Sequence, residues 1–216
     1  MTQETVVFVH GIWMPGAEMW FLKRHLRSEH GLNGRLFSYP SVRGTLNDNA
    51  RRLADFVIGT GIPTVHLVGH SLGGVVALRA LATVADMPPG RLVCLGSPLD
   101  GSRAAGHLNE RHWGHKILGR SITAGVINEA ASTWASDVVA EREIGVIAGT
   151  VSVGLGKLFT TFDGDNDGTV AVAETRLPGL RDHICLPANH TGLVFSKEVA
   201  EQTAAFIKRG EFLRES

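Results

Sequence analysis

Residues 64–74, Thr-Val-His-Leu-Val-Gly-His-Ser-Leu-Gly-Gly, join a short apolar run to a serine flanked by glycines. The apolar β-branched run predicts a strand, and a helix-favouring segment, 75–84, follows at once. Ser71 stands at the apex of this turn, with Gly69 and Gly73 two residues to either side. So sharp a turn brings the strand and helix backbones close enough that a Cβ at either glycine would clash. The stretch therefore presents a serine hydroxyl at a helix N-terminus, where backbone N–H groups favour negative charge.

Apolar runs of strand type alternate with helical patterns along the rest of the chain. Besides the strand that ends at Gly69 and its helix, strands are expected at 4–9, 35–39, 91–96, 144–148 and 183–186, and helices at 17–29, 45–59, 121–140 and 197–208. This alternation predicts one α/β domain over 1–216, with a roughly six-stranded parallel sheet and helices on both faces. Sites in such sheets form at the C-terminal ends of the strands. Segment 101–140 is the candidate cap or lid over that end.

The bulk composition fits a globular protein and excludes several partner classes. The chain has 216 residues, 44% of them hydrophobic and 19% charged, and 21 Lys and Arg balance 21 Asp and Glu. Zero net charge without a basic block argues against nucleic acid and anionic membranes as partners. No run reaches the roughly 18 apolar residues of a membrane span, and the N-terminus has no signal-peptide pattern. A soluble, cytoplasmic protein is the expectation.

The two cysteines, Cys94 and Cys185, each lie in an apolar run of strand type. If those strands lie two apart in one sheet, their backbones are separated by roughly 9–10 Å. A disulfide tolerates only about 7 Å between Cα atoms. We therefore predict two buried free thiols with packing roles.

A serine hydroxyl is a weak nucleophile that needs a base, and the base needs an acid to orient it. The chain supplies candidates in the order Ser, Asp, His. Asp167 lies in the loop 164–170 after the fifth strand, and His190 lies in the loop 187–192 after the sixth. Both loops open at the edge of the sheet where we expect Ser71.

Other residues compete for two of these roles. Asp163 and Asp165 are alternatives to Asp167, which is favoured by the pattern Asp-Gly-x-Val at 167–170. His183 is an alternative to His190, but it lies inside the run expected to form the sixth strand. We therefore favour Asp167 and His190.

The loop after the first strand provides further site candidates. An oxyanion hole needs two backbone N–H groups, and we expect those of Leu72, at the helix start, and of Ile12. Trp13 and Trp113 are candidates to line the substrate pocket. The remaining histidines of interest, His10 and His70, are expected to be buried, hydrogen-bonded structural residues.

Four short motifs together resemble the α/β-hydrolase family, and specifically its small bacterial lipases and esterases. They are Val-His-Gly-Ile at 9–12, Gly-His-Ser-Leu-Gly-Gly at 69–74, Asn-Asp-Gly-Thr-Val at 166–170 and Asn-His-Thr-Gly-Leu at 189–193. The resemblance covers 4–100 and 144–209, whereas 101–140 matches nothing. It implies Ser71 as nucleophile, His190 as base, Asp167 as orienting acid, and Ile12 and Leu72 as oxyanion donors. It also implies a trimmed six-stranded sheet that lacks the family's usual first two strands.

Two patterns could indicate a metal instead. The loop at 163–168 reads Asp163-x-Asp165-x-Asp167-Gly168 with Glu174 at the twelfth position, which matches a calcium-binding EF-hand loop. Glycines before it and Pro178-Gly179 after it argue against the helices that such a motif needs. The three histidines of the cap segment could suggest zinc, but no cysteine or carboxylate pattern completes a site around them: His107, His112 and His115.

The sequence thus predicts a serine hydrolase that cleaves carboxylic esters of small-molecule substrates through an acyl-enzyme, without metal or organic cofactor. The same machinery would serve an acyl thioesterase. A non-catalytic relative that binds a small molecule or calcium is the alternative of another class.

Overall fold

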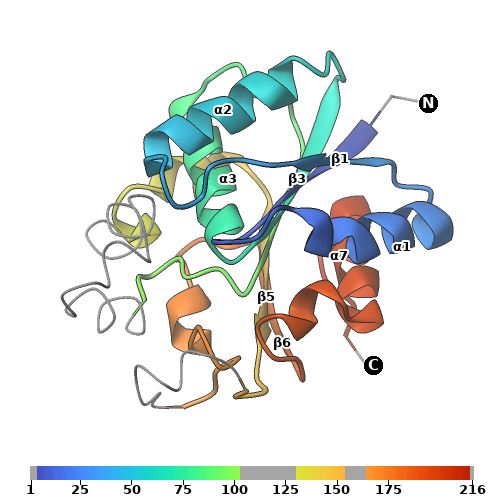
Figure 1. The fold of residues 1–216 in the computed structure, drawn as a ribbon, viewed down its shortest axis with the longest axis vertical. Helices are drawn as coiled ribbons and strands as arrows, with labels where there is room; N and C mark the ends of the chain where they lie inside the picture. Colours follow the sequence, from blue (N-terminus) through green and yellow to red (C-terminus); the bar gives the residue numbers. More distant parts are fainter. Residues whose placement is uncertain (1–3, 103–129, 154–163, 215–216) are drawn as a thin grey trace.

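The computed structural model describes residues 4–102, 130–153 and 164–214 (Figure 1). Its elements, in chain order, are β1 (Glu4–Val9), η1 (Ala17–Met19), α1 (Trp20–His30), β2 (Gly34–Phe37), α2 (Leu46–Ile58), β3 (Thr64–His70), α3 (Leu72–Thr83), β4 (Leu92–Leu95), η3 (Ala131–Thr133), α6 (Ser136–Glu141), β5 (Ile144–Gly149), η5 (Val172–Thr175), β6 (Asp182–Leu186), η6 (Gly192–Val194) and α7 (Lys197–Arg209).

The strands form one parallel sheet of six, in the order β2-β1-β3-β4-β5-β6, as the sequence predicts. Helices α2 and α3 pack together on one face, and α1 and α7 pack together on the other (Figure 1). Successive residues of β1 alternate between the two layers, since Val7 and Val9 join the core under α2 and α3 while Val6 and Phe8 join the core under α1 and α7. Both faces of the four inner strands, β1, β3, β4 and β5, are buried, which explains why these strands are continuous apolar runs in the sequence.

The strand order reverses between β1 and β3. The chain passes from β1 to β2 on one side and then crosses to β3 on the other. The loops that follow β1 and β3 therefore leave the sheet in different directions, and such a switch point at the C-terminal edge is the usual place for a site in these folds.

The turn at Ser71 is as tight as the glycine spacing predicts. A Cβ on Gly69 would lie 2.4 Å from the Gly74 nitrogen, so the expected conflict between strand and helix is confirmed there. At Gly73 the obstacle is different: a Cβ would lie 2.2 Å from the Val9 carbonyl oxygen and 2.5 Å from that of His10. Gly73 thus lets α3 approach the end of the neighbouring strand β1, and the two glycines together fix the helix against two strands.

Within the described residues, the helix predicted over 121–140 is confirmed only at its C-terminal end, in α6, and the continuous helix expected from residue 130 is wrong. Residues 130–141 form the short η3 and α6, with Trp134 between them, and 103–129 lie outside the described residues. The Ser132 N–H donates to the Leu99 carbonyl at 3.2 Å, and its hydroxyl donates to Asp100 Oδ1 at 2.6 Å. These bonds hold the segment to the loop after β4, and the Trp134 ring lies 4.7 Å from the Arg79 guanidinium.

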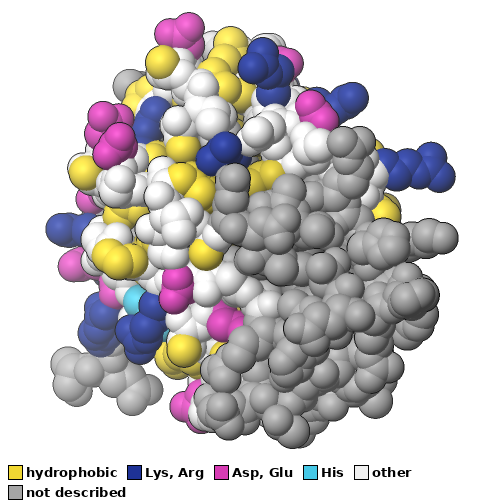
Figure 2. All heavy atoms as spheres, turned by 90° about the vertical axis from the view of Figure 1, so that its left-hand side faces the viewer, with side chains coloured by type: hydrophobic (Ala, Val, Ile, Leu, Met, Phe, Trp, Pro, Cys, Tyr) yellow, Lys and Arg dark blue, Asp and Glu magenta, His cyan; other side chains and the backbone are white. Residues whose placement is uncertain are grey.

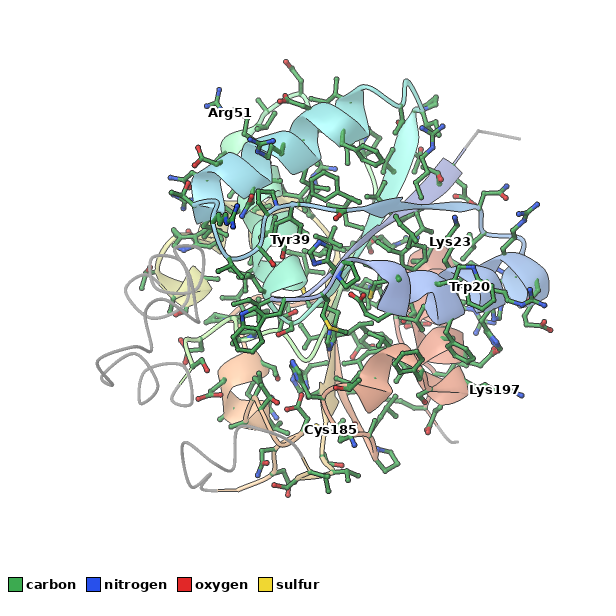
Figure 3. All side chains as sticks on the ribbon, viewed as in Figure 1. Trp20, Lys23, Tyr39, Arg51, Cys185 and Lys197 are labelled. Carbon is green, nitrogen blue, oxygen red and sulfur yellow. The ribbon has the colours of Figure 1, made fainter. Side chains whose placement is uncertain are left out.

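Both cysteines are free, as predicted, on strands β4 and β6 that lie two apart in the sheet. Cys94 is buried, and burial raises its pKa to about 12. The prediction that Cys185 is buried is wrong: it is exposed, because β6 is the edge strand and only its last residue is fully buried. Figure 3 shows Cys185 among the elements coloured for the last third of the chain.

On the face seen in Figure 2, Lys and Arg lie interspersed with Asp and Glu over the described surface. This agrees with the balanced composition. Among the described helices, none is long and apolar enough to cross a membrane.

Two imidazoles are buried where β1 and β3 end, as the sequence analysis predicts. The His10 ring stacks on Tyr39, and its two nitrogens face the Gly11 carbonyl at 2.7 Å and the Tyr39 N–H at 3.2 Å. His70 is 4% exposed, and its Nε2 donates to the His190 carbonyl at 3.0 Å. Burial, reinforced by the neighbouring His190, lowers the pKa of His70 to about 3, so the ring is neutral at physiological pH.

Gly73→Ala should destabilise the protein by about 3 kcal/mol or more, because the methyl group meets two backbone carbonyls that cannot move aside. Gly31→Ala is the matched control. Gly31 has φ 73° but open space at its Cβ position, so only the conformational cost of about 1 kcal/mol applies. Urea unfolding of both variants measures the difference, and equal losses would contradict the proposed close approach.

Stability should fall as the pH drops from about 6.5 towards 3, because unfolded His70 takes up a proton that the folded ring refuses. One such proton contributes a slope of up to about 1.4 kcal/mol per pH unit. In His70→Gln this contribution is lost and the slope becomes shallower. Urea unfolding at several pH values checks this, and unchanged slopes in the variant would contradict it.

Candidate active site

Ser71 occupies a strained backbone position between β3 and α3. Its φ of 54° and ψ of −124° lie in a region that residues with a side chain rarely adopt, and Trp13 is the one other described non-glycine residue with positive φ. The Ser71 N–H donates to the Leu95 carbonyl at 2.9 Å, which ties the turn to the end of β4. Its side chain makes no capping bond to α3. The Ser71 hydroxyl is therefore not used to cap the helix.

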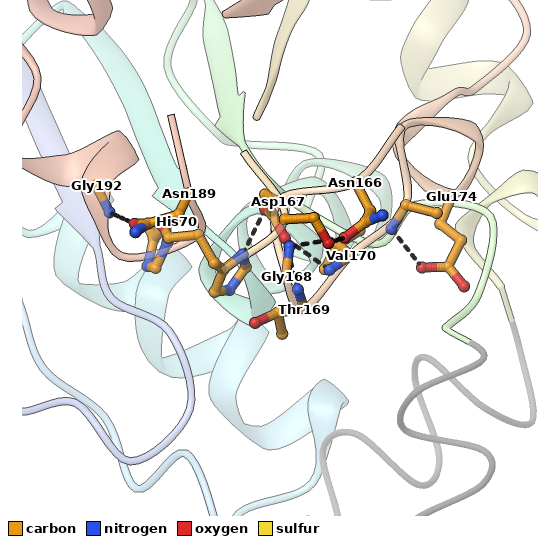
Figure 4. A network of polar contacts seen from close by, with 12 residues as sticks. His70, Asn166, Asp167, Gly168, Thr169, Val170, Glu174, Asn189 and Gly192 are labelled. Atoms are coloured by element: carbon orange, nitrogen blue, oxygen red, sulfur yellow. Dashed lines mark hydrogen bonds and ion pairs between the residues drawn. The ribbon is translucent and has the colours of Figure 1, made fainter. Parts of the chain in front are cut away.

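Asp167 and His190 form a close pair. His190 Nδ1 lies 2.7 Å from Asp167 Oδ2, and the His190 N–H donates to the Asp167 carbonyl at 2.8 Å. The other carboxylate oxygen, Oδ1, accepts the N–H groups of Thr169 at 2.9 Å and Val170 at 2.7 Å (Figure 4). Asp167 is buried, with a side chain 1% exposed, while that of His190 is 13% exposed. The carboxylate is thus fixed on both sides and the imidazole keeps access to solvent.

Gly96 and Gly149 lie directly against the Asp167–His190 pair. A Cβ on Gly96, directly after β4, would lie 2.9 Å from Asp167 Oδ2 and 3.2 Å from His190 Nδ1. A Cβ on Gly149, the last residue of β5, would lie 2.8 Å from Asp167 Cβ. The pair therefore sits on the C-terminal ends of β4 and β5.

Ser71 and His190 approach the same strand end from two sides. Ser71 is bonded to Leu95, and His190 lies over the next residue, Gly96. The His70 ring, next to Ser71 in the chain, packs against the His190 ring with 4.8 Å between centroids. The hydrogen bonds of the described residues do not include one between Ser71 Oγ and the imidazole. Such bonds are often long in a free enzyme and shorten when substrate binds.

The two backbone N–H groups that the sequence analysis expects in an oxyanion hole belong to Ile12 and Leu72. A Cβ on Gly11 would lie 3.2 Å from Ser71 Cβ, so the loop after β1 abuts the serine. Within the described part of the chain, the N–H groups of Ile12 and Leu72 donate to no protein acceptor. Leu72 is the first residue of α3, so its N–H is one of the donors that a helix leaves unpaired.

Asparagines support both loops, and the sequence analysis missed them. Asn166 Oδ1 accepts the Gly168 N–H at 3.0 Å, and its Nδ2 donates to the Gly164 carbonyl at 3.0 Å. Asn189 Oδ1 accepts the Gly192 N–H at 2.7 Å (Figure 4). The available signal was an asparagine directly before each of the two functional residues, because such side chains close turns by bonding to backbone two or three residues on.

The rival residues lie elsewhere. His183 is near the start of β6, at the other end of the strand from the His190 loop, with its Nε2 2.9 Å from Thr175 Oγ1. Asp165 is exposed, and Asp163 lies outside the described residues.

Two carboxylates of the EF-hand-like pattern, those of Asp167 and Glu174, make other contacts in the structure. Glu174 Oε2 accepts the Ala171 N–H at 2.9 Å at the start of η5, and Asp167 is bonded to His190. A calcium ion held by these carboxylates would have to break both contacts.

Of the two tryptophans predicted to line the substrate pocket, only Trp13 lies within the described residues. Trp13 follows Ile12 in the loop after β1 and is 51% exposed, with its N–H 3.2 Å from Ser41 Oγ. Trp113 and the histidine group 107, 112 and 115 lie outside the described residues, as does most of the predicted cap.

Several solved structures share this fold. The mature form of lipase BlEst2 from Bacillus licheniformis is 20% identical, with a TM-score of 0.74 over 98% of this chain and 93% of that one. The metagenomic carboxyl esterase MGS0156 is 18% identical, with a TM-score of 0.66 over 98% of this chain and 72% of that one. The product of gene lin2722 from Listeria innocua is 17% identical, with a TM-score of 0.64 over 96% of this chain and 94% of that one. At such identities the likeness is one of fold.

A comparison with curated protein sequences gives no significant match. The family model described as "Alpha/beta hydrolase family" matches residues 6–202, which include every candidate residue of the site. The chain therefore belongs to the alpha/beta hydrolase family.

Proposed function

We propose that the protein is a serine hydrolase that cleaves carboxylic esters through an acyl-enzyme, with Ser71, His190 and Asp167 as its catalytic residues. The observation that carries this proposal is the 2.7 Å contact between Asp167 and His190 at the strand end to which Ser71 is also bonded. A nucleophile, a base and an orienting acid at one edge of a sheet form the constellation that acyl transfer needs.

In the first half of the reaction, Ser71 Oγ attacks the ester carbonyl carbon while its proton passes to His190 Nε2. The carbonyl oxygen takes the displaced electron pair and becomes an oxyanion. When this intermediate collapses, the bond to the alcohol oxygen breaks, and the alcohol leaves with the proton from His190. The acyl group remains on Ser71.

In the second half, water replaces the alcohol. His190 takes a proton from the water as its oxygen adds to the acyl carbon, and the same oxyanion forms again. Its collapse breaks the bond to Ser71 Oγ, which recovers the proton from His190, and the carboxylic acid is released.

Asp167 gives His190 the tautomer that this cycle requires. A carboxylate at 2.7 Å from Nδ1 holds the ring proton there, so the Nε2 lone pair is available as a base. It also stabilises the imidazolium that forms in each half-reaction. The two N–H groups that fix Oδ1 keep the carboxylate from turning away.

The free N–H groups of Ile12 and Leu72 are the proposed oxyanion donors. Both belong to backbone that close packing at the C-terminal edge of the sheet fixes, so little reorganisation accompanies charge development. One donor of this kind contributes on the order of 2.7–4 kcal/mol to the transition state.

Two observations support an ester as the substrate. One is the set of Ser71, His190 and Asp167, and the other is the similarity of the fold to structures named lipase and carboxyl esterase. An alkoxide is a leaving group that a single imidazolium, here that of His190, can protonate. The proposed substrate is therefore a small acyl ester, with the alcohol side open to variation.

Ser71→Ala should reduce turnover of p-nitrophenyl esters by about 10⁴-fold or more, because the covalent intermediate can no longer form. The variant keeps its fold, since alanine fills less space than serine, and circular dichroism checks this. A fluorophosphonate probe should label the wild type on Ser71 and leave the variant unlabelled. Full activity in the variant would contradict the proposal. Rates measured on acyl-CoA esters under the same conditions distinguish cleavage of thioesters from cleavage of oxygen esters.

Asp167→Asn should lower kcat by about 10²–10⁴-fold, because an amide can donate to Nδ1 and favours the wrong tautomer. Asp165→Asn is the matched control, since Asp165 lies two residues away and is exposed. Steady-state kinetics on one ester distinguishes them. An effect of equal size at both positions would remove Asp167 from its proposed role.

A further inference from the structure

A second group of reactive side chains lies where α1 and α7 meet, outside the candidate active site. His25 and His30 come from α1, and Glu201 comes from the second turn of α7. The two helices lie side by side on one face of the sheet, with Trp20 and Lys23 on α1 and Lys197 at the start of α7 (Figure 3). This is the one group of at least three metal-ligating side chains with converging atoms among the described residues.

The two imidazoles converge on the two oxygens of one carboxylate. His25 Nε2 lies 2.7 Å from Glu201 Oε1, and His30 Nε2 lies 3.1 Å from Glu201 Oε2. All three ligand atoms fall within 4.8 Å of one another. The histidine side chains are 14% and 18% exposed and that of Glu201 is 46% exposed, so the group opens to solvent on the carboxylate side.

The fold holds the histidines in place. His25 stacks on Phe21, with 6.0 Å between centroids, and Phe21 contacts Phe195 just before α7. His30 is the last residue of α1, where Gly31 ends the helix with φ 73°. A spacing of five residues would place two side chains on different faces of a continuous helix, but the position at the helix end lets His30 turn towards α7.

His30 indicates that more than an ion pair is involved. Its Nε2 is shielded from solvent and lies near Glu201 Oε2, yet the geometry is not that of a hydrogen bond. At 3.1 Å from the carboxylate oxygen the nitrogen has an electrostatic partner, and a cation held by both groups would give it a better aligned one.

We propose that His25, His30 and Glu201 bind a divalent transition-metal ion of the zinc type. Two imidazole nitrogens and one carboxylate oxygen are a ligand set that Zn²⁺ prefers, with water completing the tetrahedron. Ligand atoms at about 2.0–2.1 Å from such an ion lie roughly 3.3–3.4 Å apart. The observed 3.1 Å separation needs to open by roughly 0.3 Å and the 2.7 Å separation by roughly 0.6 Å.

The ion would connect α1 to α7. Helix α7 starts seven residues after His190 and contacts η6, which directly follows the loop that carries the proposed base. The expected role is structural, because the catalytic candidates lie at the strand ends and share no residue with this group.

Isothermal titration calorimetry with ZnCl₂ on the untagged full chain, after treatment with EDTA, tests the proposal. One zinc ion should bind with a Kd of about 1 μM or tighter. At a free zinc concentration of 100 times Kd, Tm should rise by roughly 5–10 °C. Absence of binding at about 100 μM zinc, roughly 100 times the expected Kd, overturns the proposal.

Variants assign the ligands. Glu201→Gln, His25→Ala and His30→Ala should each weaken binding by at least about 10-fold, the lower range for loss of one metal contact. The matched control on α7 is Glu198→Gln, one turn earlier and exposed. A triple variant, His107→Ala, His112→Ala and His115→Ala, excludes the other histidine group. The assignment holds only if both controls bind zinc like the wild type and the three ligand variants do not; any other pattern overturns it.

Discussion

The close approach of α3 to the ends of β1 and β3 is the constraint on which the rest of the structure depends. It is possible because Gly69 and Gly73 have no Cβ. A methyl group at either position would lie closer than van der Waals contact to atoms of the neighbouring backbone. This contact forces Ser71 into its strained conformation and points the start of α3 at the C-terminal edge of the sheet. The unpaired N–H of Leu72 follows from the same geometry, so one steric condition places both the candidate nucleophile and an anion donor.

The second half of the site depends on glycines as well, at positions that belong to other strands. Gly96 and Gly149 leave room on the ends of β4 and β5 for the Asp167–His190 pair. His70 joins the halves, because it is buried next to Ser71 and bonds to the His190 carbonyl. Its neutral ring allows it to lie against His190 without electrostatic repulsion when His190 carries a proton in the proposed cycle.

Sequence reasoning found the sheet and the candidate site because both depend on local patterns. Buried parallel strands such as β1 are continuous apolar runs, and the turn at Ser71 is readable from its glycines. Sequence reasoning failed for features that depend on contacts between residues far apart in the chain. The segment 130–141 bends because Ser132 bonds to the loop after β4. Cys185 is exposed because β6 is an edge strand, and the composition of a strand does not reveal its place in the sheet. The group of His25, His30 and Glu201 was not predicted because it joins residues more than 170 positions apart in the sequence.

The position of β6 at the edge of the sheet has a consequence for how the protein is made. Among the described strands, β6 pairs with β5 alone and is followed by the His190 loop, whereas Ser71 follows the inner strand β3. A growing chain can therefore build its nucleophilic turn long before the last strand has been synthesised. Because pairing between remote segments forms slowly, the base docks late. Partly folded chains thus contain Ser71 without its proposed base, and the proposed activity would arise together with the completed native state.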